Sequence, residues 1–531
     1  MTDHITSLTA KNEPSLGVHY TNAEMAGVLI RVILDPLTTE KDPKSILNLR
    51  ILDPACGDGS FLLGVADYLT HTLLTPPDRT ARVADSSLSM LKHRVSQCIA
   101  GVDVDERAVN LAFARLHAAG YPIHRSQIRC LNSLFQAETY SGVDKNPLTL
   151  ESAFGEMFSR PRPGFDAVLG NPPYVDAATL MKKAPDIRRL CLQGYQTATG
   201  AWDLYCVFIE RALQLTRAGG RHGFIVPSAL CAAEYARGAR SCLVAHGGLT
   251  EIIDLRDSDG FDARVYPMGY ALTVDTNRSP QPVQISGAGA VRAGSPTSSS
   301  DPWPLLDSGP DWALTHAHPD LSTLAEVHGG ATVSEAYTMA PLLTEVCHGD
   351  TCSIRVINTG TIDPLCVLWG KKKLRYLGRR LQSPVVARPQ LDDLPPTRLQ
   401  QSRQKKVVVA GLSRRLEAVA DLEGEYLAAK STVVVMPVDG VSVAYLAGVI
   451  NSDAASAWYR WRYGTLALRG GHLRVGPPQL RALPVPDPRM YPEAAAEVER
   501  LTLALCALDG EDEVLWQALN SAVNLLYVAQ D

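Results

Sequence analysis

The sequence predicts an α/β protein with two domains: a doubly wound, mainly parallel sheet, followed by a mixed α/β domain. Three observations support this prediction. Short apolar strands alternate with amphipathic helices up to residue 228, which is the pattern of a parallel sheet covered by helices. Residues 276–312 are rich in Gly, Ser and Pro and indicate a linker, and the pattern beyond them is less regular. We therefore expect domains at residues 1–275 and 313–531.

The expected elements of the first domain follow one another as strand, helix and strand. The strands are LRILD (49–53), CIAGVDV (98–104), IRCLN (128–132), FDAVLGN (165–171) and HGFIVPS (222–228). The helices cover residues 60–74, 106–120 and 203–220, and the last two end at glycines. A doubly wound sheet binds ligands at the carboxyl ends of its strands, so residues there are the candidates for function.

In the second domain the expected elements are fewer and mixed in type. VVVAG (407–411) and TVVVMPV (432–438) predict strands, and an apolar helix is expected around residues 442–464.

The composition is that of a globular protein and excludes several classes. The 531 residues carry 51 Lys and Arg against 56 Asp and Glu, a formal net charge of −5, which excludes a histone-like binder. The 11 Cys residues are scattered, and MTDHITSLTA lacks the pattern of a signal peptide. No apolar run reaches the roughly 18 residues of a membrane-spanning helix. We expect a soluble, cytoplasmic protein without a membrane partner.

The loop DPACGDGSF (53–61) joins the first strand to the first helix. Gly57 and Gly59 allow the backbone to approach a ligand without a Cβ clash. The carboxylate of Asp53 at the strand tip disfavours a phosphate and favours a ligand that carries an ammonium and a sulfonium group. A tight turn with only a structural role is the alternative.

The second and third strands also end in polar residues. Asp103, in GVDVD (101–105), is placed to accept hydrogen bonds from both hydroxyls of a ribose, and Val104 to pack on a purine face. Asp105 is expected to cap the next helix. Asn132 ends the third strand, where its amide either bonds an adenine edge or forms a local Asx turn; the sequence leaves both open.

The strongest signal is Asn171-Pro172-Pro173-Tyr174, directly after the fourth strand. The prolines fix the backbone and keep the Pro172 carbonyl out of sheet pairing. With the side-chain carbonyl of Asn171, it offers two acceptors to one NH₂ group, and Tyr174 offers a flat face to a planar ring. A structural Pro-Pro turn is the alternative.

In this order, DPACGDGSF, GVD and NPPY resemble the adenine-N6 DNA methyltransferases, and GVHYT (17–21) before them is similar to the gamma class, the TaqI-like enzymes. The resemblance covers roughly residues 15–275. It continues more loosely through 355–372 and 446–464, which look like a TaqI-type specificity domain. It implies a Rossmann-like methyltransferase sheet, a target-recognition domain, S-adenosylmethionine as methyl donor and double-stranded DNA as substrate.

The resemblance also implies roles for single residues. The implied cofactor-binding residues are Tyr20, Thr21, Asp53, Gly57, Gly59, Asp103, Val104 and Asn132. Asn132 stands where the family usually has Asp, so a hydrogen bond from the cofactor's adenine would reach an amide oxygen without a charge.

The implied catalytic residues hold an adenine that has left the duplex. Asn171 and Pro172 accept its amino hydrogens and Tyr174 stacks on one face. An aromatic residue clamps the other face; Phe261 is the first choice and Tyr266 the alternative.

Basic residues gather in the second domain although the chain is negative overall. Residues 371–406 hold eleven Lys and Arg against two Asp, and residues 458–481 hold five Arg among Trp and Tyr. Such runs are typical of a surface that contacts DNA phosphates, and a solvated face over a core helix is the alternative. The predicted DNA-binding residues are Lys371, Lys372, Lys373 and Arg375.

No metal is expected. Cys347, His348 and Cys352 in CHGDTC lack a second ligand pair at zinc-site spacing. The leading hypothesis is a site-specific DNA adenine-N6 methyltransferase of a restriction-modification or related defence system, with a cognate restriction endonuclease as a separate chain. The runner-up is an N-P-P-Y methyltransferase acting on RNA or on a protein glutamine amide. A non-enzymatic specificity subunit is the third hypothesis.

Overall fold

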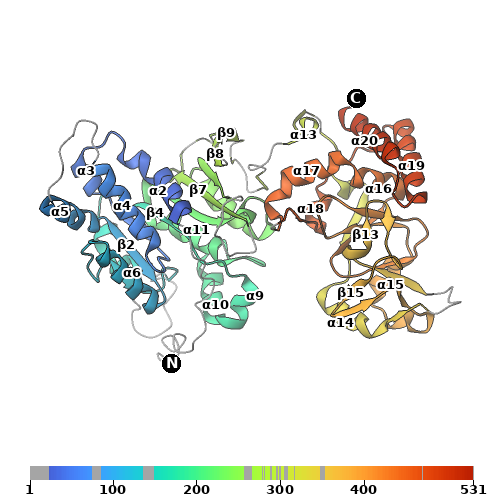
Figure 1. Cartoon of the computed structure of the whole chain (residues 1–531), viewed down its shortest axis with the longest axis horizontal. Coiled ribbons are helices and arrows are strands. Elements are labelled where there is room, and N and C mark those ends of the chain that lie inside the picture. The colour runs from blue at the N-terminus through green and yellow to red at the C-terminus, as the bar shows by residue number, and fades with distance from the viewer. Residues whose placement is uncertain are drawn as a thin grey trace. The chain divides into compact units, whose positions relative to one another are not determined.

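The computed structural model divides the chain into two compact units, Met1–Leu306 and Asp307–Asp531 (Figure 1). It describes residues 23–74, 85–135, 149–255, 266–277, 281–287, 290–294, 301–303, 309–315, 317–346, 353–468 and 470–529, together with Ser279 and Thr297.

The first unit is built on one sheet with the strand order β3-β2-β1-β4-β5-β7-β6-β8-β9. Its strands are β1 (Ile51–Asp53), β2 (Ile99–Asp103), β3 (Ile128–Cys130), β4 (Phe165–Gly170), β5 (Thr216–Pro227), β6 (Glu251–Asp254), β7 (Pro267–Thr273), β8 (Val283–Gly287) and β9 (Ala290–Gly294). The strands from β3 to β5 are parallel, whereas β7 is antiparallel to β5 and β6. The strand order reverses between β1 and β4, which is where a doubly wound sheet binds its ligand.

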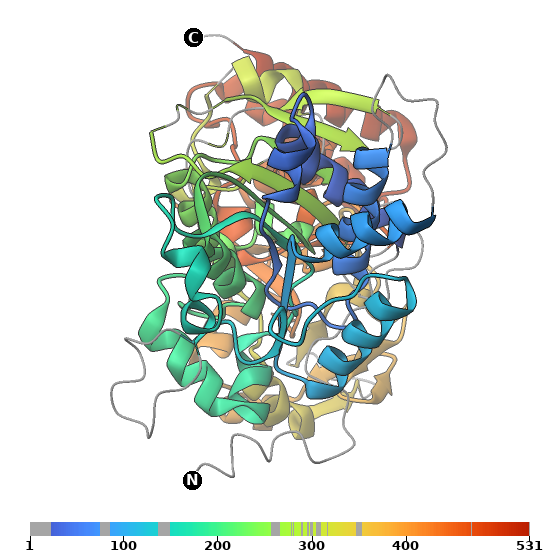
Figure 2. The ribbon, with the colours of Figure 1, turned by 90° about the vertical axis from the view of Figure 1, so that its left-hand side faces the viewer.

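Helices cover both faces of this sheet, so the predicted doubly wound fold is confirmed. Buried apolar residues of α2 (Ala23–Thr38), α4 (Ser60–Leu74) and α6 (Glu106–Ala118) form one core cluster with residues of the sheet. The helix α11 (Leu204–Leu215) packs against β4, β5 and α12 (Arg237–Ala245). Figure 2 shows the blue and the green helices on different sides of the sheet. The other helices are α3 (Pro43–Leu47), α5 (Asp85–Ser96), α7 (Leu150–Ala153), α8 (Gly155–Phe158), α9 (Ala177–Lys183) and α10 (Pro185–Gly194).

One helix of the first unit ends earlier than the sequence predicts. The expected helix over 203–220 stops at Leu215, and β5 begins at Thr216, whose backbone is extended (φ −89°, ψ 129°). Thr216 is β-branched and pairs with Phe165 of β4. A register shift then accommodates the following residues before Ala167 pairs with Arg221, and Gly219 there takes a φ of +73°. The pairing with β4 therefore overrides the helical pattern.

The segment 276–312, which the sequence predicts as a linker, contains two strands of the first sheet. Within residues 276–312, β8 pairs with β6 and β9 pairs with β8, so both strands extend the first sheet. Thr297 and Trp303 are also buried, at 2% and 5% exposure. The Thr297 hydroxyl accepts a hydrogen bond from the Leu249 amide, and the Trp303 amide donates to the Cys231 carbonyl. Gly and Ser composition did not reveal these pairings because a sheet edge tolerates small polar residues.

The second unit contains two four-stranded sheets and a group of helices. The first sheet has the order β10-β22-β18-β20 and the second β11-β17-β12-β21. Their strands are β10 (Ala325–Gly329), β11 (Leu343–Glu345), β12 (Ile354–Ile357), β17 (Pro384–Val386), β18 (Lys406–Ala410), β20 (Ala418–Asp421), β21 (Tyr426–Ala428) and β22 (Thr432–Pro437). The predicted strands at 407–411 and 432–438 thus correspond to β18 and β22.

Three two-stranded pairs complete the strands of this unit in the described residues. They are β13 (Ile362–Asp363) with β14 (Cys366–Val367), β15 (Leu374–Tyr376) with β16 (Arg379–Leu381), and β19 (Leu412–Ser413) with β23 (Leu473–Arg474).

The helix predicted around 442–464 consists of two helices, α16 (Val443–Asn451) and α17 (Asp453–Tyr463). The helix is interrupted at Ser452, whose backbone is extended. The Ser452 side chain caps α17 by accepting a hydrogen bond from the Ala455 amide. The other helices are α13 (Asp311–Thr315), α14 (Val333–Met339), α15 (Pro396–Ser402), α18 (Pro477–Arg481), α19 (Pro492–Ala507) and α20 (Glu513–Val528). None of the described helices, in either unit, has the length and apolar character needed to cross a membrane.

Candidate active site and nucleic-acid interface

The carboxyl ends of β1, β2 and β4 bring the predicted motifs to one edge of the first sheet. Asp53 pairs in register with Gly101, two residues before Asp103, and β4 on the other side of β1 ends at Gly170. A Cβ at Gly170 would lie 2.5 Å from Oδ1 of Asp53. Gly170 therefore lets the chain that leads into Asn171 pass directly beside Asp53.

Asp53 is a buried carboxyl group without a basic partner among the described residues. It is 2% exposed, and its Oδ1 accepts a hydrogen bond of 3.1 Å from the Ala55 amide. Burial raises the pKa of Asp53 to about 8, and the charges of Asp103 and Asp58 act in the same direction. Asp58 differs, because Arg115 of α6 pairs with it at 2.6 Å. A bound cation would therefore stabilise the ionised form of Asp53.

The loop after Asp53 uses its two glycines differently. Both have positive φ, +50° at Gly57 and +80° at Gly59. A Cβ at Gly59 would lie 2.8 Å from Cβ of Ala112, so Gly59 permits close packing of the loop against α6. A Cβ at Gly57 would meet no atom of the described residues within 4 Å. Only Gly57 thus faces open space in which a ligand could lie.

Asp103 connects β2 to this loop. Its Oδ2 accepts from the Gly57 amide at 2.9 Å and its Oδ1 from the Asp105 amide at 2.9 Å. Burial raises its pKa, and these backbone hydrogen bonds oppose the shift. Each carboxylate oxygen keeps a further acceptor site. Val104 is 54% exposed, and Asp105 caps α6 through the Arg107 amide, as predicted.

Asn132 lies in the turn after β3 and forms the Asx turn that the sequence left open. Its Oδ1 accepts a hydrogen bond of 3.0 Å from the Leu134 amide. The next residue, Ser133, donates its hydroxyl to the Pro54 carbonyl at 2.8 Å. This bond brings the turn next to the 53–61 loop. The sequence reasoning missed Ser133, because a single serine in a turn carries no pattern.

The Asn171–Tyr174 loop is held by its own tyrosine. The Tyr174 hydroxyl lies 2.6 Å from Oδ1 of Asn171 and 3.0 Å from the carbonyl oxygen of Ile225 in β5, and its single proton is shared between these two acceptors, with the shorter contact to Asn171. Burial raises the pKa of this hydroxyl well above its usual value, so it remains protonated. The ring packs edge-on against Tyr205, with 6.1 Å between ring centroids. The Asn171 carboxamide is thereby fixed in orientation.

Asp203, which the sequence reasoning also missed, anchors the end of this loop. It precedes α11 and caps it through the Tyr205 amide, and its Oδ1 accepts from the Val175 amide at 2.9 Å. Burial raises its pKa to about 6. An aspartate directly before an apolar helix was the available signal, although it predicts a cap and not a link to the preceding loop.

Some predicted residues lie outside the described part of the chain: Tyr20, Thr21, Phe261 and the CHGDTC segment. The alternative clamp residue Tyr266 is described, and its carbonyl accepts from the Ser228 amide at 2.8 Å. Within the described residues no group of His, Cys, Asp and Glu is arranged to hold a metal ion.

Eight of the eleven cations in the basic run 371–406 of the second unit fall into two groups of four. Four of its cations hold the unit together. Lys371 pairs with Asp509 at 2.7 Å, and Arg379 donates to the carbonyls of Ala340 and Leu343. Arg398 pairs with Glu335 at 3.1 Å, and Lys406 pairs with Asp421 in the interior. The structure therefore places the predicted DNA-binding residue Lys371 in an ion pair, apart from its three companions.

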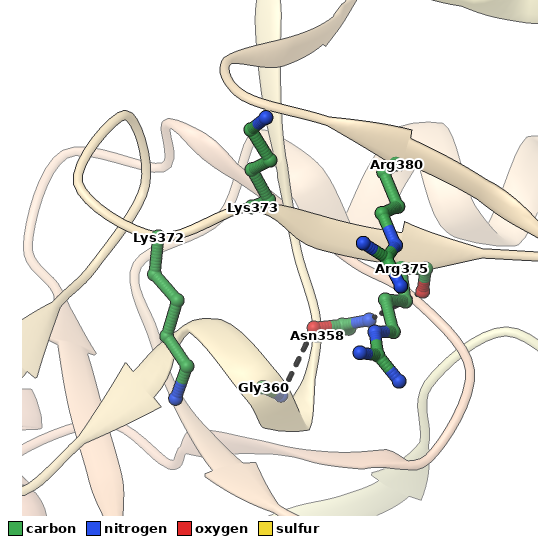
Figure 3. A pocket seen from close by; sticks show the side chains of 6 residues that line it. All are labelled: Asn358, Gly360, Lys372, Lys373, Arg375 and Arg380. Atoms are coloured by element: carbon green, nitrogen blue, oxygen red, sulfur yellow. Dashed lines mark hydrogen bonds between the residues drawn. The ribbon is translucent and has the colours of Figure 1, made fainter.

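The other group lines a pocket of about 510 Å³ (Figure 3). The lining residues are Asn358, Gly360, Lys372, Lys373, Arg375 and Arg380. Three of the four predicted DNA-binding residues thus lie together, and Arg380 joins them. Arg380 lies in this pocket because β16 pairs with β15, and the sequence does not reveal that pairing.

In the second basic run, 458–481, most of the aromatic residues are part of the core. Trp458, Tyr459 and Tyr463 are 7% exposed or less. Arg460 and Arg481 donate to the backbone carbonyls of Arg414 and Val327. This region therefore fits the alternative of a helix packed on a core.

Comparisons with known proteins agree with the motifs. Residues 97–261 match the family described as Eco57I restriction-modification methylase. The Type II methyltransferase M.BstVI of Geobacillus stearothermophilus is 25% identical over 251 residues, 46% of this chain and 40% of that protein. The Type II methyltransferase M.PaeR7I of Pseudomonas aeruginosa is 27% identical over 283 residues, 52% of this chain and 41% of that protein. The chain thus matches about two-fifths of the length of these relatives.

The fold of the whole chain also has a solved counterpart. The structure of the Type IIL restriction-modification enzyme MmeI in complex with DNA superposes with a TM-score of 0.61 at 12% identity, over 99% of this chain and 79% of that one. At this identity the likeness concerns the fold. The resemblance drawn from the motifs is confirmed: residues 97–261, which hold Asp103, Asn132 and the Asn171–Tyr174 loop, match the Eco57I restriction-modification methylase family.

Proposed function

We propose that this chain is a site-specific DNA methyltransferase that transfers a methyl group from S-adenosylmethionine to N6 of an adenine in duplex DNA. The observation that carries the proposal is the position of Asn171 and Pro172 directly after β4, whose last residue, Gly170, lies beside the buried Asp53. A restriction-modification system, with a cognate endonuclease on another chain, is the proposed setting.

The residues at this edge fit S-adenosylmethionine. The buried carboxyl group of Asp53 suits a ligand with a positive charge, since a cation offsets the cost of ionising it there. The open space at Gly57 leaves room for the ligand beside the loop. Asp103 retains acceptor sites for ribose hydroxyls, and the exposed Val104 can cover a purine. Asn132 lies in the adjoining turn, where its amide can reach the adenine edge.

The chain's own residues prepare the target nitrogen. The lone pair of an exocyclic adenine nitrogen is delocalised into the ring and is a poor nucleophile. Oδ1 of Asn171 has a second lone pair beside the one that binds Tyr174, so it can accept one amino hydrogen. The Pro172 carbonyl accepts the other. These bonds favour a tetrahedral nitrogen, orient its lone pair and stabilise the positive charge that develops there. The cofactor, when bound, would supply the electrophilic methyl group and leave as S-adenosylhomocysteine, and the methylated nitrogen would then release one of its protons to water.

An adenine stacked inside the duplex cannot reach the Asn171–Tyr174 loop, whereas an adenine that has left the duplex can. We propose that Tyr174 stacks on one face of the extruded adenine, with Phe261 or Tyr266 on the other, and that this stacking offsets the few kcal/mol of unpairing. The second unit, with its basic pocket, is the proposed DNA-recognition unit.

The test is to incubate the protein with labelled S-adenosylmethionine and duplex DNA, structured RNA or glutamine-containing peptides, and to identify the product by mass spectrometry of nucleosides or residues. N6-methyladenine in DNA is the expected product. N4-methylcytosine would redirect the proposal to another exocyclic amine, and labelled RNA or peptide would favour the runner-up hypothesis. Asn171→Ala is the inactive control.

A further inference from the structure

The cations of the β15–β16 hairpin lie on two different faces of the hairpin. Leu374 pairs with Leu381, Arg375 with Arg380, and Tyr376 with Arg379. Leu374, Tyr376 and Leu381 are buried in the core cluster of this unit. Because successive residues of a strand point to opposite faces, Arg375 and Arg380 both lie on the other face, toward the pocket (Figure 3).

Two like charges therefore face each other across the hairpin. Arginines at directly opposed positions repel, which destabilises a strand pair. No carboxylate lines the pocket, and within the described residues none of its four cations forms an ion pair. Outside the pocket lining, burial and the charge of Asp363 raise the pKa of Glu417, whereas the charges of Arg415 and Lys372 lower it. An anion in the pocket would offset the repulsion.

The hairpin and the floor of the pocket are held by backbone contacts. The turn residues Leu377 and Gly378 have φ of +44° and +86°, as in the two-residue turns that match the twist of a hairpin. Asn358 donates from Nδ2 to the Arg375 carbonyl at 3.0 Å and accepts at Oδ1 from the Gly360 amide at 2.9 Å. These bonds fix the orientation of the Asn358 side chain. The charge in the pocket comes from the four cations alone.

The side chains favour a backbone phosphate over a base edge. Base reading requires donors held in a fixed pattern, for which arginine is suited. Lysine is a point charge on a flexible stem, and two of the four cations are lysines. Figure 3 shows Lys372 and Lys373 directed to different sides of the hairpin. Such an arrangement recognises negative charge along a strand and not the pattern of a base pair.

We propose that the pocket between Asn358 and the β15–β16 hairpin binds phosphodiester groups of the DNA backbone, with Arg375 and Arg380 as its central pair. The proposal rests on the function proposed above, because it takes the nucleic acid to be the methylation substrate. It assigns no sequence preference to these residues. It also excludes Lys371 and Arg379 from the contact, since their charged groups already have partners.

The test compares DNA binding by the full chain and by the double variant Arg375→Ala/Arg380→Ala across a salt series. The matched control is Arg489→Ala/Arg500→Ala, which removes the same charge at two exposed ion pairs of the same unit. Each lost phosphate contact lowers the slope of log affinity against log salt by about one unit, so the slope should fall by about two. At 0.1 M salt the affinity should fall roughly tenfold to one-hundredfold, equally on methylatable and unrelated duplexes.

Three results would overturn the proposal. One is an unchanged slope, another is a loss equal to that of the control variant, and the third is a loss confined to one sequence, which would mean base reading. S-adenosylmethionine affinity and melting temperature should not fall, and Arg375→Gln/Arg380→Gln repeats the test if the alanine variant is unstable. Failure of the proposed function can be told apart from failure of this proposal. If the chain methylates no DNA but the double variant still lowers the salt slope, the pocket binds phosphate and the proposed function is wrong.

Discussion

At the carboxyl edge of the first sheet, polar groups are buried or partly buried and hydrogen-bonded within the protein, whereas the cations of the β15–β16 pocket are exposed. Asp53, Asp103 and Tyr174 each have hydrogen bonds that fix their positions. Arg375 and Arg380 have no ion pair in the described structure. A reacting group requires fixed geometry in a medium of low dielectric, and a polyanion requires accessible charge in water. At the first site, removal of a single side-chain group should change the rate of methyl transfer. At the second site, DNA affinity should depend on the salt concentration.

The largest effect should follow removal of the Asn171 acceptor. Asn171→Ala should lower the rate of methyl transfer at saturating DNA by about a hundredfold or more, the usual cost of losing one positioned group that stabilises developing charge. S-adenosylmethionine affinity should stay within a factor of two, because Asp53 and Asp103 are untouched. Single-turnover kinetics and calorimetry measure the two quantities. Parallel loss of both would mean that Asn171 supports the loop and not the reaction.

A second prediction separates the two groups of cations in the basic run. Lys406 is buried with Asp421, whereas its neighbour Lys405 is exposed. Lys406→Met should lower the free energy of unfolding by about 3 kcal/mol, because it leaves a buried charge unpaired. Lys405→Met should change it by less than about 0.5 kcal/mol. Urea unfolding measures both, and equal stabilities would mean that the buried pair contributes nothing.

Sequence could predict that the motifs of the first unit meet at one edge of the sheet, because each motif is local. The strand ends, the glycines of the 53–61 loop and the Asn171–Tyr174 string each lie within a few residues, and parallel strands place them at one edge. What it missed depends on distant pairing. The Tyr174 bond to Ile225 and the Asp203 bond to Val175 join residues 51 and 28 positions apart. Nothing in the composition of either segment indicates its partner.

The basic run shows the opposite limit. Counting charge treated all eleven cations alike, yet Lys371, Arg379, Arg398 and Lys406 are used within the unit. Period-two alternation in residues 374–381 would have separated Arg379 from Arg380, but only once the hairpin and its register were known. The resemblance to a known family supplied what patterns alone could not, namely the expectation of S-adenosylmethionine as cofactor and of methyl transfer as the reaction.

A third prediction concerns pH at the buried edge. The pKa of Asp53 is about 8 in the folded chain, against an ordinary value near 4 in the unfolded chain. The folded state therefore keeps a proton that the unfolded state releases, so the stability of the first unit should fall as pH rises from about 4 to about 8. Asp53→Asn should flatten this dependence and make the chain more stable than the natural one at pH 8.

Cofactor binding gives a second measurement of the same group. A cation beside Asp53 lowers its pKa, so S-adenosylmethionine should displace a proton at pH 7. The binding enthalpy should then depend on the ionisation enthalpy of the buffer, and this dependence should disappear in Asp53→Asn. An enthalpy independent of buffer in the natural chain would show that Asp53 does not meet the positive charge.

The smallest predicted effect divides the role of Tyr174 between its ring and its hydroxyl. Tyr174→Phe keeps the stacking face but removes the donor to Asn171 and Ile225. The transfer rate should fall about fivefold, the value of one net hydrogen bond of about 1 kcal/mol. The fluorescence of 2-aminopurine at the target position should match that of the natural chain, because the flipped base is still stacked. Tyr174→Ala should lose a further 1–3 kcal/mol or so of stacking and should change the fluorescence as well. A natural rate in Tyr174→Phe would show that the Asn171 carboxamide keeps its orientation without the hydroxyl, and the geometry of the reacting edge would then rest on the prolines alone.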